Sequence, residues 1–197
     1  MRLIGLTGGI GTGKSTVTDY LHRRYNLPIL DADIYARDAV AIGAPVLSAI
    51  FERYGAKMLQ PDGTLDRPRL GAIVFSQPDE RHWLEAQIHP YVRECLVREI
   101  ANLAVDATAV LAIPLLFEAK MTDLTSEIWV VSCDRQTQLQ RLMTRDRLDR
   151  SAAALRIESQ MPLDDKIALA DVHLDNSTNI ADLVAQIDDV ISIGSRS

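Results

Sequence analysis

The sequence has little cysteine, no excess of basic residues and no long apolar run. Its 197 residues include only two cysteines, Cys95 and Cys133, far apart and in apolar surroundings, so we expect buried free thiols and no disulfide. The net charge of −6 disfavours a general nucleic-acid binder but allows a local pocket for a small anion. The apolar run after Met1 is too short for a signal peptide or membrane span, and no later run is longer. We therefore expect a cytoplasmic protein that contacts neither nucleic acid nor membrane.

Internal repeats and low-complexity linkers are also absent. What the sequence does show is five short apolar segments that alternate with stretches of helical periodicity. This alternation predicts an α/β fold, a five-stranded parallel sheet flanked by helices. The predicted strands are residues 2–7, 27–31, 109–117, 127–133 and 171–175. Pro114 has no N–H to donate, so it should end or edge the third strand.

The stretch from about residue 34 to 106 contains no convincing strand and predicts several helices, broken at 43–45 and 60–68. We expect it to form a helical subdomain on the substrate side. The predicted organisation is a single domain with a core of residues 1–33, 107–138 and 167–197, a helical substrate-binding subdomain of about 34–106 and a lid of about 139–166.

Residues 7–16, TGGIGTGKST, match the phosphate-binding loop pattern G-x-x-x-x-G-K-[ST] through Gly8, Gly13, Lys14 and Ser15. The loop lies between a predicted strand and an amphipathic helix, and its glycines allow backbone N–H groups to point at phosphate oxygens. Lys14 should reach the β- and γ-phosphates, and Ser15 should ligate Mg²⁺. A glycine-rich turn without a ligand is the alternative. The loop residues expected to bind ATP are Gly9, Gly11, Thr12, Gly13, Lys14, Ser15 and Thr16.

Two GTPase motifs are missing, because neither D-x-x-G nor N-K-x-D occurs anywhere in the chain. This favours an ATP-dependent kinase or an ATPase over a regulatory switch.

Asp31 and Asp33 follow the second predicted strand, and ligands in α/β sheets bind beyond the carboxyl ends of strands. We therefore expect these acids to face the phosphate loop. A carboxylate there can orient an acceptor hydroxyl and take its proton, and Asp33 is the first candidate for this role. Alternatively, Asp33 is only the N-cap of the next helix.

The arginine-rich segment 140–150 predicts a mobile lid. Arg141 and Arg145 are four residues apart, share a helix face and could stabilise the charge of a transferring phosphoryl group. A solvated helix face is the alternative. Arg156 and Lys166 extend the basic stretch, with surface positions as the alternative interpretation.

Two further polar residues are candidates for the acceptor site. Glu118, at the exit of the third strand, is expected to orient a Mg²⁺ water or the acceptor, or else to cap the next element of the chain. His89 belongs either to the acceptor pocket or to the structural framework. The other histidines show no metal-ligand spacing, and Trp83 and Trp129 are expected in the core.

Several stretches together resemble the dephospho-CoA kinase family. Between Leu6 and Asn179 they occur in the order LTGGIGTGKST, DAD followed by AR, IHP, PLLFE, the RL..R arginine stretch, QMPLDDK, AD and DNS. The resemblance implies a parallel-sheet core, a helical domain for dephospho-CoA and a lid. It also implies transfer of the ATP γ-phosphoryl group to the ribose 3′-hydroxyl of dephospho-CoA, with Mg²⁺. The sequence itself makes no obligate protein partner evident.

The resemblance also implies residue roles. Asp33 resembles the base, Lys14 and Ser15 the phosphate and metal residues, and Arg141 and Arg145 catalytic lid groups. Asn176 resembles part of the adenine pocket. The residues expected at the acceptor are Thr7, Asp33, His89 and Glu118.

Two departures from the family pattern are minor. Thr12 stands where serine is common, and Ile113 precedes Pro114 where an acid or valine is common, which leaves less redundancy for placing Mg²⁺.

The residues themselves predict an ATP-dependent phosphoryl transferase acting on a hydroxyl, and two rivals stay open. One is a nucleoside-monophosphate kinase, whose acceptor would need an arginine cluster in the helical subdomain. The available arginines are Arg53, Arg67, Arg69, Arg81, Arg93 and Arg98. The other rival is a non-catalytic ATP sensor, which needs no acid near the γ-phosphate.

Overall fold

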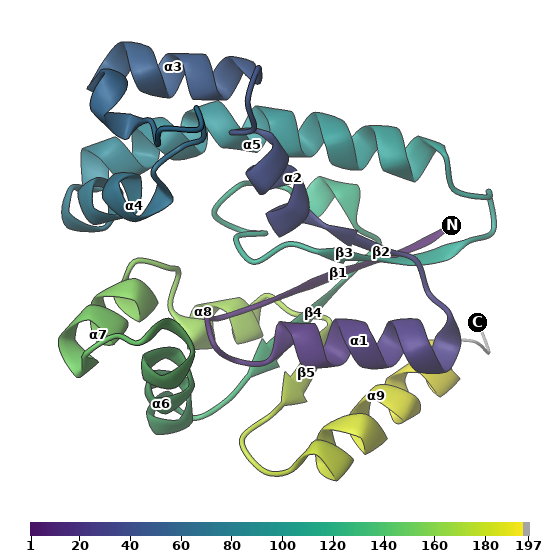
Figure 1. Ribbon diagram of the computed structural model, residues 1–197. Coiled ribbons are helices and arrows are strands. Elements are labelled where there is room, and N and C mark those ends of the chain that lie inside the picture. Colours follow the sequence, from purple (N-terminus) through teal and green to yellow (C-terminus); the bar gives the residue numbers. More distant parts are fainter. Residues whose placement is uncertain (195–197) are drawn as a thin grey trace. The chain divides into compact units, whose positions relative to one another are not determined.

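A five-stranded parallel sheet forms the centre of the larger part of the chain (Figure 1). The computed structural model describes residues 1–194. The strands are β1 (Arg2–Gly8), β2 (Ile29–Asp31), β3 (Thr108–Ala112), β4 (Glu127–Ser132) and β5 (Val172–Asp175). The predicted sheet is confirmed, although β3 ends at Ala112 and does not reach Phe117 as expected. Residues 195–197 of the expected core lie outside the described residues.

The strand order β2-β3-β1-β4-β5 places β1 in the middle of the sheet. β1 pairs in parallel with β3 on one side and with β4 on the other, and β4 pairs in parallel with β5. The chain leaves β1 toward one edge and later returns to build the other edge. The carboxyl end of β1 is therefore a topological switch point, where doubly wound sheets bind ligands.

The described residues form two compact units, residues 1–30 with 103–194, and residues 31–102. The helices of the first unit are α1 (Lys14–Tyr25), α6 (Arg135–Asp146), α7 (Arg150–Glu158), α8 (Leu163–Ala168) and α9 (Ile180–Gly194), with the short 3₁₀ turn η2 (Thr122–Leu124).

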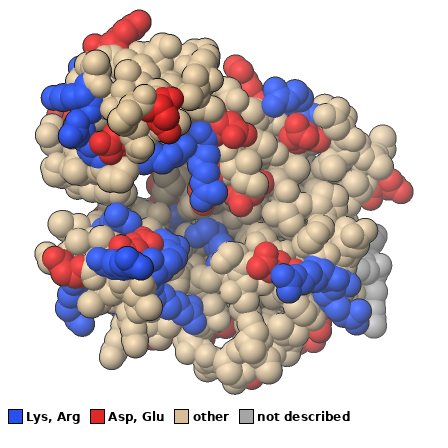
Figure 2. Space-filling model, in the orientation of Figure 1, with Lys and Arg blue, Asp and Glu red and all other residues tan. Residues whose placement is uncertain are grey.

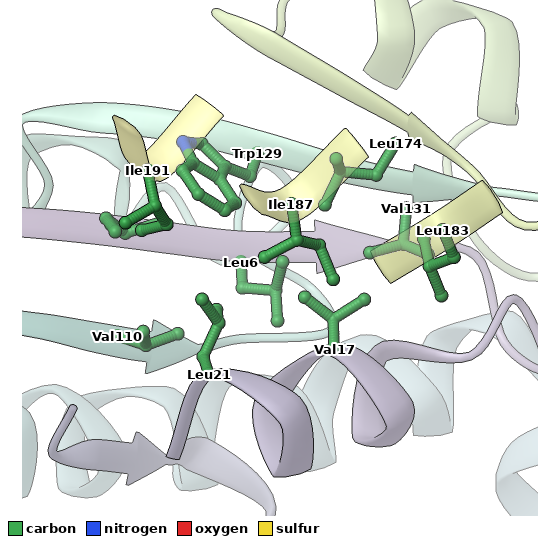
Figure 3. Close-up of a cluster of buried hydrophobic side chains, with 11 residues drawn as sticks. Leu6, Val17, Leu21, Val110, Trp129, Val131, Leu174, Leu183, Ile187 and Ile191 are labelled. Atoms are coloured by element: carbon green, nitrogen blue, oxygen red, sulfur yellow. The ribbon is translucent and has the colours of Figure 1, made fainter. Parts of the chain in front are cut away.

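The main core of this unit lies where α1 and α9 pack against the sheet (Figure 3). Trp129 of β4 is fully buried among Ile187 and Ile191 of α9, as expected for a core tryptophan. Val17 and Leu21 of α1 pack on the same cluster. Burying each large aliphatic side chain contributes about 1.5–3 kcal/mol, so this layer fixes α1 against the end of β1.

The second unit is helical, as the sequence predicts for this stretch. It contains α2 (Ala32–Asp38), α3 (Pro45–Tyr54), the 3₁₀ turn η1 (Ala56–Met58), α4 (Arg67–Ser76) and α5 (Pro78–Ala101). The expected breaks are confirmed: α3 begins at Pro45, and a turn with one antiparallel bridge between Leu59 and Leu65 precedes α4.

A polar cluster joins α3 to α5 within this unit. Arg53 donates two hydrogen bonds to the Glu80 carboxylate, at 2.7 and 2.9 Å, and Tyr54 donates a third. The Arg53 guanidinium lies 4.6 Å from the ring centre of Trp83, which is half-buried. These contacts lower the pKa of Glu80 to about 2, chiefly through the Arg53 hydrogen bonds.

Two predictions from composition can be compared with the structure. Cys95 and Cys133 are both buried and free, as expected. In residues 1–194, no helix is both long and apolar enough to cross a membrane.

Candidate nucleotide-binding site

The phosphate loop, residues 8–13, begins at the last residue of β1 and leads directly into α1. Gly8, Gly11 and Gly13 have φ values of 146°, 78° and 104°, a region that favours glycine. Gly13 is the N-cap of α1, and no side chain caps this helix end. The first turn of α1 also contains no acid. A helix start of this kind offers backbone N–H groups and a positive dipole end to an anion.

The glycines also make room for neighbouring elements, which phosphate binding alone does not explain. A Cβ atom at Gly8 would lie 2.2 Å from the carbonyl oxygen of Val131 on β4. A Cβ at Gly9 would lie 2.6 Å from Nε2 of Gln138, and one at Gly13 would lie 2.2 Å from Nδ2 of Asn176. Interpreting the glycines as a phosphate cradle was therefore incomplete, because β4, α6 and the loop after β5 approach the same backbone.

Lys14 lies against the start of the loop. Its Nζ donates to the carbonyl oxygens of Gly8 and Gly9, at 3.0 and 3.1 Å. Ser15, in the first turn of α1, is exposed, and Thr16 is half-buried. The structure thus brings the expected cationic and hydroxyl groups to the helix start, next to the loop amides.

Thr12 and Thr7 have buried side chains whose hydroxyl groups bond inside the protein. The Thr12 hydroxyl donates to the carbonyl of Gly9 at 2.8 Å, and Thr12 is fully buried. Thr7 is also fully buried, and its hydroxyl donates to the carbonyl of Pro114 at 3.1 Å. Both threonines hold backbone segments together here. Contact of Thr7 with the acceptor, expected from the sequence, stays a prediction.

Asn176 and Arg141 converge on one carbonyl group of the loop. Asn176 is buried, and its Nδ2 donates to the carbonyl of Thr12 at 2.8 Å. Arg141 of α6 donates to the same oxygen and to the carbonyl of Asn176, both at 3.3 Å. The structure therefore brings Arg141 to the phosphate loop. The expected adenine contact of Asn176 stays a prediction.

Arg145, one turn further along α6, is exposed and pairs with Asp146 at 2.7 Å. Arg156 of α7 contacts the same carboxylate at 2.7 Å. Figure 2 shows Lys and Arg side chains gathered with acids over the surface formed by α6 and α7. The two guanidinium groups lower the pKa of Asp146, mainly through hydrogen bonding from Arg145. The role of Arg145 in phosphoryl transfer stays a prediction.

An ion pair between a fully buried lysine and a half-buried glutamate lies next to the exit of β3. Lys166 of α8 is fully buried, and its Nζ lies 2.8 Å from Oε1 of Glu118 and donates to the carbonyl of Pro114 at 3.2 Å. The backbone N–H of Met161 also donates to Oε1 of Glu118. Oε2 of Glu118 is buried, with no hydrogen-bond partner among the described residues. The surface alternative for Lys166 was wrong, because its side chain is fully buried against Glu118, a partner that lies far away in the sequence.

Asp33 and His89 belong to the helical unit. Asp31, and not Asp33, is the N-cap of α2, since its Oδ1 accepts the backbone N–H of Asp33 at 2.9 Å. The N-cap alternative for Asp33 is therefore wrong, and its side chain is exposed in the first turn of α2. His89 is half-buried inside α5, directly before the intrahelical Pro90.

Two contributors to the loop's surroundings were not predicted from the sequence. They are Gln138 and Gln160, which bond the backbone of Ile10. Gln160 and Lys166 lie in the QMPLDDK stretch, which gives no residue-level reason for their roles. Gln138 lies one helical turn before Arg141 and on the same face of the helix. This spacing was the feature of the sequence that could have indicated a role for Gln138 near the loop.

Comparison of the sequence and the fold with known proteins identifies the family of this chain. The sequence profile described as dephospho-CoA kinase matches residues 2–182. The chain belongs to the dephospho-CoA kinase family. The dephospho-CoA kinase of Trichormus variabilis is 56% identical over 187 residues, 95% of each chain. That of Synechocystis is 57% identical over 186 residues, covering 94% of this chain and 92% of the other.

Solved structures agree with this membership. Dephospho-CoA kinase from Campylobacter jejuni superimposes with a TM-score of 0.73 at 28% identity, covering 100% of this chain and 98% of that one. Shikimate kinase from Bacteroides thetaiotaomicron gives 0.58 at 14% identity over 98% of both chains, which shows the fold alone. The expected family, the kinase class and the P-loop kinase fold are confirmed.

Proposed function

We propose that this kinase transfers the γ-phosphoryl group of ATP to the ribose 3′-hydroxyl of dephospho-CoA, giving coenzyme A and ADP. The single observation that carries the proposal is the phosphate loop at the switch point of the sheet, in a chain of this family. The relatives named above are dephospho-CoA kinases over nearly their whole length, which supports the same acceptor for this chain.

In this proposal the loop and α1 bind the triphosphate. Backbone N–H groups at the start of α1 and the Lys14 ammonium face its oxygens, and Lys14 exchanges its bonds to the loop carbonyls for bonds to phosphate. Arg141, held at the carbonyl of Thr12, adds charge beside the transferring group.

The acceptor oxygen forms a bond to the γ-phosphorus while the bond to the β–γ bridging oxygen breaks. The hydroxyl proton passes to Asp33, and ADP leaves with the bridging oxygen. The exposed carboxylate of Asp33 at the start of α2 supports this role. Glu118 and His89 are proposed to contact the acceptor.

The residues present fit a Mg²⁺ ion that is bound mainly by the nucleotide. Within residues 1–194 no group of three or more His, Cys, Asp or Glu side chains is arranged to hold a metal. The exposed Ser15 hydroxyl at the start of α1 would supply one ligand. Bound Mg²⁺ would neutralise phosphate charge.

The arginines available to a nucleoside-monophosphate acceptor are mostly engaged within the helical unit. Four of the six form ion pairs there: Arg53 with Glu80, Arg69 with Asp66, Arg81 with Glu85 and Arg98 with Glu99. This weakens the rival acceptor class, because a monophosphate site needs cationic groups directed at the ligand.

The proposal is tested by measuring ADP release with four acceptors in parallel, namely dephospho-CoA, AMP, CMP and pantothenate. We expect rapid Mg-ATP-dependent ADP release with dephospho-CoA alone. Preference for AMP or CMP would replace the proposal with the rival kinase, and equal slow release with every acceptor would indicate an ATPase or sensor.

A further inference from the structure

Two glutamines hold opposite sides of the same loop residue, Ile10. Nε2 of Gln138 donates to the carbonyl of Ile10 at 2.7 Å. The backbone N–H of Ile10 donates to Oε1 of Gln160 at 2.8 Å. Ile10 is the third residue of the six that begin and end with Gly8 and Gly13, so these bonds act near the middle of the phosphate loop.

The fit of Gln138 requires its glycine neighbours. Gln138 is buried, and a Cβ at Gly9 would lie 2.6 Å from its Nε2. A Cβ at Gly11 would lie 3.3 Å from the backbone oxygen of Gln138. Glycines on both sides of Ile10 thus allow α6 to approach the loop closely enough for the amide to bond.

The side chain of Ile10 joins the same elements. It packs against the cluster formed by Leu139 and Leu142 of α6 and Ala153 of α7. Gln138 lies on α6, and Gln160 follows the end of α7. Helices α6 and α7 are therefore attached to Ile10 in three ways: through its backbone carbonyl, its backbone N–H and its apolar side chain.

These attachments determine where Arg141 lies. Gln138 and Arg141 are three residues apart on α6, and therefore on one face of the helix. They donate to the carbonyls of Ile10 and Thr12, two residues apart on the loop. A shift of α6 that breaks the Gln138 bond would also move the Arg141 guanidinium.

We propose that Gln138 and Gln160 are positioning residues that fix the register of the α6–α7 pair on the phosphate loop. They place Arg141 for phosphoryl transfer without touching the substrates. The catalytic part of this inference depends on the proposed function, whereas the fixed conformation of Ile10 does not.

Gln160→Met tests the inference, because it removes the acceptor of the Ile10 N–H while keeping the side-chain length. We expect kcat to fall about tenfold, since small misplacement of catalytic groups is costly, and the ATP Kd to stay within about threefold of wild type. Gln138→Met removes the donor to the Ile10 carbonyl and should likewise lower kcat about tenfold while leaving the ATP Kd within about threefold of wild type. Gln140→Met is the matched control, because Gln140 is exposed on α6, and it should leave kcat unchanged.

Hydrogen exchange of the Ile10 amide supplies a readout that needs no acceptor. Its exchange should be accelerated in Gln160→Met and slow in Gln160→Glu, whose carboxylate oxygen still accepts the bond. Wild-type kcat and slow Ile10 exchange in Gln160→Met would overturn the inference, as would an equal loss of kcat in Gln140→Met. If wild type phosphorylates no dephospho-CoA but Ile10 exchange shows this pattern, the proposed function fails and the fixing of Ile10 by the two glutamines is retained.

Discussion

Carbonyl groups of the phosphate loop accept hydrogen bonds from side chains that reach them from several elements. The carbonyl of Gly9 accepts from Lys14 and from the Thr12 hydroxyl, and the carbonyl of Thr12 accepts from Asn176 and Arg141. Because the loop contains several residues at positive φ, these bonds stabilise a backbone that local preferences alone would not select. The protein's own side chains thus help to hold the loop in its shape.

Gly13→Ala tests the close approach of Asn176 to the loop. The added Cβ would meet Nδ2 of Asn176 at 2.2 Å, on top of strain at a φ of 104°. Gly43→Ala is the matched control, because Gly43 has a φ of 87° and nothing within 4 Å of the added Cβ. In urea unfolding, Gly43→Ala should lower the free energy of unfolding by about 1–3 kcal/mol, and Gly13→Ala should lower it by clearly more. ATP affinity should fall only in Gly13→Ala, and equal costs with equal affinities would contradict the packing explanation.

Asp33→Asn tests the proposed base directly. The amide keeps the shape of the side chain but cannot accept the hydroxyl proton, so turnover should fall by about a hundredfold or more while ATP affinity is retained. Steady-state kinetics with dephospho-CoA and equilibrium titration with ATP measure the two quantities. Asp38→Asn, also exposed on α2, is the control. Unchanged turnover in Asp33→Asn would remove Asp33 from the mechanism.

Sequence patterns identified the loop residues but not the side chains that support the loop. Lys14 and Ser15 belong to a contiguous motif with one physical explanation, so they are readable from sequence. Gln160 and Lys166 act through partners more than forty residues away, and such pairings follow from the tertiary fold. A lysine side chain is also expected to be exposed unless a charged partner is known, and the sequence does not reveal the partner of Lys166.

At the scale of elements, the segment from Gln160 to α8 links the loop to the exit of β3. Gln160 bonds Ile10, Met161 bonds Glu118, and Lys166 bonds both Glu118 and Pro114. Since Thr7 also donates to the carbonyl of Pro114, β1 and α8 share one acceptor just beyond the end of β3.

Lys166→Met should strongly destabilise the protein, because it leaves the Glu118 carboxylate without its buried partner. Removing one member of a fully buried ion pair costs about 3–5 kcal/mol, and because Glu118 is 22% exposed the loss measured by urea unfolding should lie below that range. Adding Glu118→Gln should recover part of this loss, because the remaining buried group is then uncharged. Lys120→Met, at an exposed lysine two residues after Glu118, should change the unfolding free energy by less than about 0.5 kcal/mol. A Lys166→Met protein as stable as wild type would show that the pair contributes nothing.

The five strands were predictable because each is a short apolar run between helical stretches. Their ends were less predictable: β3 stops at Ala112 although the apolar run continues to Phe117. Pairing with β1 ends at that point, and Pro114 lies just beyond it, where its carbonyl accepts from Thr7 and Lys166. Strand ends depend on neighbouring strands, which a single segment does not reveal.

For the whole molecule, stability should depend on acid pH through Glu80. The fold lowers the pKa of Glu80 from 4.5 to about 2. The ionised carboxylate therefore stabilises the folded state at pH values above the pKa of the unfolded state. This contribution is present above about pH 4.5 and lost as the pH falls toward 2. Urea unfolding from pH 6 to 3 should therefore show Glu80→Gln less stable than wild type at pH 6, with the difference shrinking below pH 4.5. Glu52→Gln, at an exposed site on α3, is the control, and a pH-independent difference for Glu80→Gln would contradict the prediction.

The most direct test of the central claim is identification of the reaction product. The purified chain is incubated with Mg-ATP and dephospho-CoA, and the product is analysed by mass spectrometry and phosphorus NMR. We predict that dephospho-CoA gains one phosphoryl group, located on the ribose 3′-oxygen, with one ADP formed for each coenzyme A. Unmodified dephospho-CoA beside accumulating ADP and free phosphate, or a phosphoryl group at another position, would contradict the claim.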